Sequence, residues 1–223
     1  IGDATTGGNI KIEDNSGLNQ IVGNDVNSRG ALYLNTVSNV TVNSVDCSYA
    51  TGGQAANSWG IRVVNTASNS NISILNCNAG NRGRGIWVDN GRDYTITGNN
   101  LVGSGSGTPA LELSNIIPGS LTGGILASGN TFGTPNFHRG VAISNMRDLL
   151  IGDASVLNAN FVLEDNSGLN QCVGGDYNSH GVLYLSNVNN VTVDNVDCSK
   201  STAGASNSYG IVVSNGANNQ GVT

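Results

Sequence analysis

Short segments with alternating apolar and polar residues recur along the whole chain. Residues 60–65 (Gly-Ile-Arg-Val-Val-Asn) are typical: a small residue, then apolar residues at alternate positions, then Asn. This alternation predicts a β-strand with one face in a core. Strands of this type are predicted at 30–35, 60–65, 85–90, 110–115, 140–145, 181–186 and 210–215.

A second type of segment has the sequence Asn-Val-Thr-Val or a close variant, and it begins near Asn39, Asn71, Asp93 and Asn190. The two types recur every 20 to 30 residues, roughly the length of one coil in a solenoid, so we expect two or three strands per coil. Alternation predicts inward ladders at Ile61, Val63, Ile86, Val88, Leu111, Leu113, Val141 and Ile143. It predicts outward side chains at Arg62, Trp87, Glu112, Ala142 and Val212.

A longer repeat contains these coils. Residues 1–4 return as 151–154, residues 13–20 return unchanged as 164–171, and 58–61 (Ser-Trp-Gly-Ile) return as 208–211 with Tyr for Trp. This divides the chain into a first copy, 1–150, and a partial second copy, 151–223, continuous with the same solenoid. Neither end carries a polar cap, so we expect the sequence to be a window on a longer array.

With these motifs the whole chain resembles the right-handed parallel β-helix repeat family, the fold of pectate lyases, polygalacturonases, phage tailspikes and many large secreted surface proteins. The resemblance implies an all-β, right-handed parallel β-helix of about nine coils with 20 to 30 residues per coil. It says little about activity, because this scaffold hosts many functions.

Composition agrees with a turn-rich β protein, since 32 of 223 residues are Gly and 11% are charged. A net charge of −6 with nine scattered basic residues disfavours nucleic acid as a partner. No apolar run is long enough to span a membrane. The cysteines, Cys47, Cys77, Cys172 and Cys198, lack metal-site spacing; they are interpreted as buried free thiols, with a disulfide between stacked coils as the alternative.

No catalytic constellation is evident, so we do not expect an enzyme. The Asp-Asp, Gly-His-Gly and Arg-x-Lys hallmarks of polygalacturonases are missing, and the histidines His138 and His180 have no partner at a recognisable spacing. The basic residues Arg82, Arg84 and Arg92 surround Trp87, with Asp89 and Asp93 nearby. They are interpreted as a solvated turn, with a sugar-binding or catalytic patch as the alternative.

Two further sites remain open. Glu13 and Asp14, with their copies Glu164 and Asp165, form either an Asx turn or a weak calcium site. The sequences starting at Asn39, Asn71 and Asn190 fit the N-glycosylation sequon and are predicted to share one corner of the coil, where Asn also suits a turn.

One strand is apolar in both phases, so one phase is expected to face outward. It contains Leu32, Tyr33 and Leu34, and it recurs as Leu183, Tyr184 and Leu185. Together with Trp87, these residues are predicted to form an interaction surface for another rod or a flanking loop.

From these observations we expect a structural, extracellular or cell-surface repeat protein that self-associates and forms a rod in a filament, sheath, stalk or adhesin shaft. The alternative is a carbohydrate-active or carbohydrate-binding β-helix, for which the unrepeated stretch 82–147 is the place to look.

Overall fold

The structure is a computed structural model that describes residues 10–13, 31–48, 59–64, 69–102, 109–114, 125–132, 139–144, 161–164, 183–186, 189–198, 210–214 and 220–223. Within these ranges the chain forms β-strands and no helix, and all the pairings between the strands are parallel. The predicted all-β class is therefore confirmed. None of these residues belongs to a helix that is long and apolar enough to cross a membrane.

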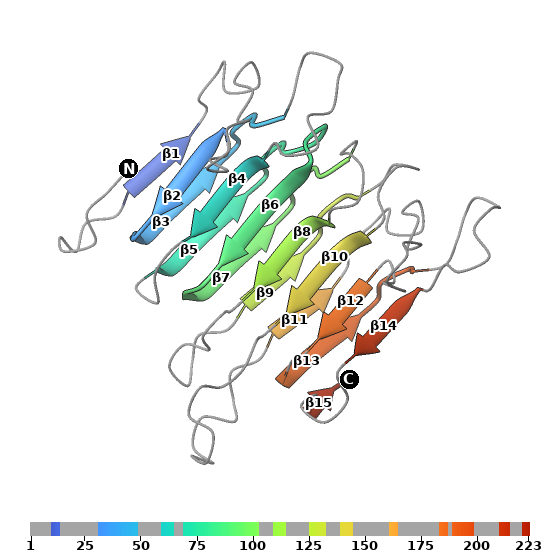
Figure 1. The fold of residues 1–223 in the computed structure, drawn as a ribbon. Helices are drawn as coiled ribbons and strands as arrows, with labels where there is room; N and C mark the ends of the chain where they lie inside the picture. Colours follow the sequence, from blue (N-terminus) through green and yellow to red (C-terminus); the bar gives the residue numbers. More distant parts are fainter. Residues whose placement is uncertain are drawn as a thin grey trace.

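Successive strands alternate between two sheets, which Figure 1 shows as two layers running from β1 at one end to β15 at the other. The odd sheet contains β1 (Ile10–Glu13), β3 (Ser38–Asn43), β5 (Ser70–Leu75), β7 (Arg92–Thr97), β9 (Ile125–Ser128), β11 (Phe161–Glu164), β13 (Asn189–Asp194) and β15 (Gln220–Val222). The even sheet contains β2 (Leu32–Asn35), β4 (Trp59–Val64), β6 (Arg84–Asp89), β8 (Pro109–Ser114), β10 (Arg139–Ser144), β12 (Leu183–Ser186) and β14 (Ile211–Ser214). Sheets of eight and seven parallel strands are compatible with a solenoid.

The core lies between the two sheets and is built from the inward positions of both. Ile61, Ile86 and Leu111 are in register on successive even strands and are completely buried, and Val40 and Ile72 are in register in the odd sheet. A fully buried aliphatic side chain of this size contributes about 1.5–3 kcal/mol. The ladders predicted from the alternation are thus confirmed for the first six positions (Ile61, Val63, Ile86, Val88, Leu111 and Leu113). Val141 and Ile143 continue the register, but their side chains lie outside the described part.

A third, shorter ladder follows the odd strands. Asp46, Asn78, Asn100 and Thr131 form isolated parallel bridges from one coil to the next. The side-chain oxygens of Asp46, Asn78 and Asn100 each accept a hydrogen bond from the backbone N–H two residues later. This is the Asx-turn geometry that makes Asn and Asp favourable at turns.

The corner between the odd strands and this third ladder has a fixed left-handed conformation. Ser44, Asn76, Gly98, Gly129 and Asn195 each follow an odd strand directly and have φ values between 48° and 67°. Asn and Gly adopt positive φ at low cost, which explains why they dominate this corner.

The strands of the second long repeat fall at the positions that the duplicated sequence indicates. β11, β12 and β13 occupy the same places in the repeat as β1, β2 and β3, and β14 corresponds to β4. The predicted division into 1–150 and 151–223 remains a prediction about sequence organisation.

Candidate functional site

The most distinctive surface feature lies on the outer face of the even sheet. Tyr33, Arg62, Trp87 and Glu112 are in register on β2, β4, β6 and β8, and each is partly exposed. Neighbouring strands are about 4.8 Å apart, so the row is about 14 Å long. The alternation in the sequence correctly predicted the outward direction of Arg62, Trp87 and Glu112.

Two arginines and two tryptophans pack together around this row; we call Trp59, Arg62, Arg84 and Trp87 the Trp–Arg cluster. The guanidinium carbon of Arg62 lies 4.2 Å from the Trp87 ring centroid and 5.8 Å from that of Tyr33. The Arg84 carbon lies 5.0 Å from the Trp87 centroid, and both guanidinium carbons lie 5.6 Å from the Trp59 centroid. These are cation–π distances, so each arginine is held against aromatic faces.

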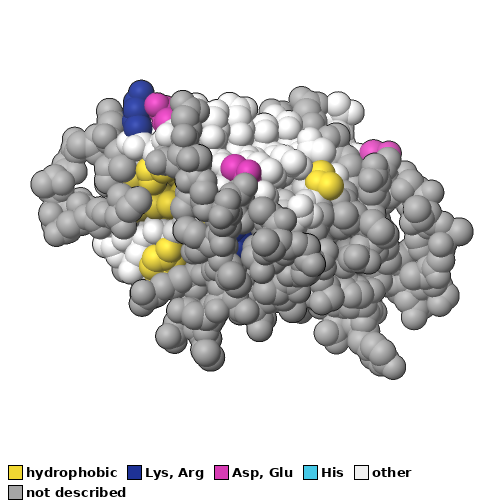
Figure 2. Space-filling model, turned by 90° about the horizontal axis from the view of Figure 1, so that it is seen from above, with side chains coloured by type: hydrophobic (Ala, Val, Ile, Leu, Met, Phe, Trp, Pro, Cys, Tyr) yellow, Lys and Arg dark blue, Asp and Glu magenta, His cyan; other side chains and the backbone are white. Residues whose placement is uncertain are grey.

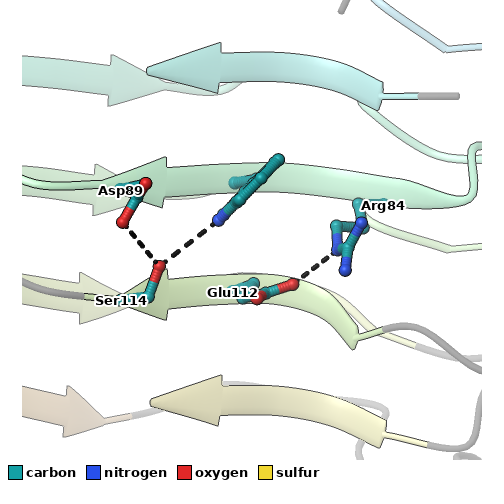
Figure 3. Close-up of polar contacts among 5 residues, drawn as sticks. Arg84, Asp89, Glu112 and Ser114 are labelled. Atoms are coloured by element: carbon teal, nitrogen blue, oxygen red, sulfur yellow. Dashed lines mark hydrogen bonds and ion pairs between the residues drawn. The ribbon is translucent and has the colours of Figure 1, made fainter. Parts of the chain in front are cut away.

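Polar contacts fix the edges of the cluster, and Figure 3 shows how Arg84, Asp89, Glu112 and Ser114 lie. Arg84 Nε donates to Glu112 Oε2, and Ser114 Oγ donates to Asp89 Oδ1 at 3.1 Å. The indole Nε1 of Trp87 donates to Ser114 Oγ at 3.4 Å. Both carboxylates are therefore engaged in hydrogen bonds at the edge of the cluster.

Trp59 is the most buried member of the cluster, with 4% of its surface exposed. Its ring stacks on Trp87 with centroids 5.9 Å apart. Its Nε1 is buried and, within the described part of the chain, has no hydrogen-bond acceptor. Such a donor costs about 1–3 kcal/mol relative to one that is paired.

The predicted grouping of Arg82, Arg84 and Arg92 around Trp87 is wrong, both as a solvated turn and as a single patch. Of these three arginines, Arg84 is the one that contacts Trp87. Arg82 is completely buried and donates to the carbonyl oxygens of Cys47, at 2.9 Å, and Ser48, at 2.8 Å. Arg92 lies in β7 of the odd sheet, beside Asp93. Arg84 and Arg92 are close in sequence but lie in different sheets, because the chain passes from the even sheet to the odd sheet between them.

The predicted interaction surface is divided between core and exterior. Leu34, Leu183 and Leu185 are fully buried and Leu32 is 6% exposed, so these leucines belong to the core and do not contribute to a surface. Tyr33 and Trp87 face outward. Tyr184 is in register with Ala142 and Val212, but its side chain lies outside the described part.

Cys47, Cys77 and Cys198 are free thiols. Cys47 and Cys77 are buried, as predicted, and Cys198 is partly buried. Burial raises the pKa of the Cys47 thiol to about 12 and that of Cys198 to about 11, and it also raises the pKa of Cys77. Cys172 lies outside the described residues.

Most of the predicted calcium site lies outside the described residues. Glu13 is exposed at the end of β1, the backbone of Glu164 ends β11, and Asp14, Asp165 and the side chain of Glu164 lie outside the described part. Among the residues whose side chains are described, no three His, Cys, Asp or Glu side chains are grouped to hold a metal ion. His138 and His180 also lie outside the described residues.

The sequon residues do share one position in the odd strands. Asn39, Asn71 and Asn190 are each the second residue of their strand, and Asn71 Nδ2 donates to Asn39 Oδ1 at 2.8 Å. Asn39 and Asn71 have φ values of 55° and 52°, so the backbone alone favours Asn here. Glycosylation of these residues stays a prediction.

In Figure 2 the described surface consists mostly of backbone and uncharged polar side chains, with few charged groups.

Trp59 and Trp87 were candidates for contacts from the sequence alone, but their association with Arg62 was not predicted. The signal is present in the repeated segments: Arg62 and Trp87 are both the third residue of Gly-Ile-x-Val, and Trp59 and Arg84 both precede its Gly. Aligning these two segments as neighbouring parallel strands brings all four residues together.

Comparison of the chain with protein-family models, curated proteins and solved structures finds no match.

Proposed function

We propose that this chain is a structural segment of an extracellular or cell-surface protein. In this proposal it forms a right-handed parallel β-helix of about nine coils. It acts as a rigid rod in a filament, sheath, stalk or adhesin shaft, and it self-associates with identical copies.

The observation that carries the proposal is the unbroken register of both sheets across the sequence repeat. β9 pairs with β11 and β10 with β12, so the last strands of the first copy continue directly into the second. An architecture in which each coil contacts only its neighbours can be lengthened by duplication, and its rigidity comes from the mutual burial of adjacent coils.

The interior supports a mechanical role because polar groups as well as apolar ones are joined from coil to coil. Asn99 Nδ2 donates to Asn130 Oδ1 at 2.9 Å and to the Ile74 carbonyl at 3.0 Å, linking three successive odd-sheet coils. Both Asn99 and Asn130 are fully buried, and buried hydrogen bonds of this kind resist the relative movement of neighbouring coils.

Electron microscopy of the native assembly, with the chain located by an antibody, tests this function. The expected result is a rod in which strands repeat every 4.8 Å or so along the axis with right-handed coils. A compact particle with an open groove beside Trp87, together with cleavage of a polysaccharide, would overturn the structural function in favour of the carbohydrate-active alternative.

A further inference from the structure

We draw no further inference here: the strongest candidate, the Trp–Arg cluster on the outer face of the even sheet, is occupied by contacts within the chain, since Arg84 is paired with Glu112, Arg62 has a partner of its own and both guanidinium groups lie against the tryptophan rings, and nothing in the structure shows what would cover it.

Discussion

Buried amide side chains at single positions connect the coils of this protein. Asn99 Oδ1 accepts a hydrogen bond from the Cys77 N–H at 2.9 Å, and Asn99 Nδ2 donates to Ile74 and Asn130. Asn130 Nδ2 in turn donates to the Ile96 carbonyl at 2.9 Å. These residues are polar because they lie where the odd strands end and backbone groups at the corner need partners.

Replacing Asn99 with Ala should therefore destabilise the fold strongly. The substitution leaves the Cys77 N–H unpaired in the core and removes the side-chain hydrogen bonds to the Ile74 carbonyl and to Asn130, so we expect a loss of about 2–4 kcal/mol in the free energy of unfolding, measured by urea denaturation. Asn100→Ala is the matched control, since Asn100 is exposed and accepts one turn hydrogen bond from Val102; its cost should be about 1 kcal/mol or less. Equal costs for the two variants would contradict the role of the buried ladder.

Buried thiols make the free energy of unfolding depend on pH in the alkaline range. Burial raises the pKa of Cys47 from 9.0 to about 12, so the folded protein keeps a proton that the unfolded chain releases above about pH 9. This contribution is fully present below pH 9 and is lost as the pH rises toward 12. We expect the urea midpoint to fall between pH 8 and pH 11, and to fall less in Cys47→Ala. A Cys47→Ala variant whose midpoint falls as steeply as the parent's would refute this assignment.

At the scale of the strands, the sequence predicted the even sheet well and the odd sheet in part. All seven segments predicted from alternating residues form strands of the even sheet. A small residue followed by alternating aliphatic residues is typical of a strand with one buried face. Strands β1, β9, β11 and β15 were not predicted, since they lack the Asn-Val-Thr-Val sequence. The Trp–Arg cluster was missed because it depends on which strands are neighbours, and the burial of Arg82 depends on carbonyl groups from another coil.

A substitution at the same ladder position should change the free energy of unfolding differently on β4 and on β14, the last even strand in the described part of the chain. Ile61 on β4 is fully buried, whereas its counterpart Ile211 on β14 is 51% exposed. We expect Ile61→Ala to cost about 2–5 kcal/mol, because it opens a cavity in the core. Ile211→Ala should cost about 1 kcal/mol or less, since half of the side chain is already in water. Chemical denaturation of both variants checks this, and a larger cost at Ile211 would contradict the described stacking.

At the scale of the whole molecule, we expect stability to depend on the stacking of neighbouring strands in each sheet, and adding strands tests this. In the first repeat, Ile61 and Val63 lie between β2 and β6 and are fully buried, while their counterparts Ile211 and Val213 are 51% and 48% exposed. A fusion that appends a second copy of residues 74–114 after Thr223 supplies the same neighbour to β14. Because adjacent coils bury each other's apolar ladders, we expect the amides of 211–214 to gain protection in hydrogen exchange and the thermal midpoint to rise.

The control fusion carries Ile86→Asp and Val88→Asp in the appended segment only. These substitutions place charges where the covering side chains would pack, so the protection of the 211–214 amides should not change. Equal protection in the two fusions would mean that the added chain does not continue the sheets, and the additive picture of the stack would fail.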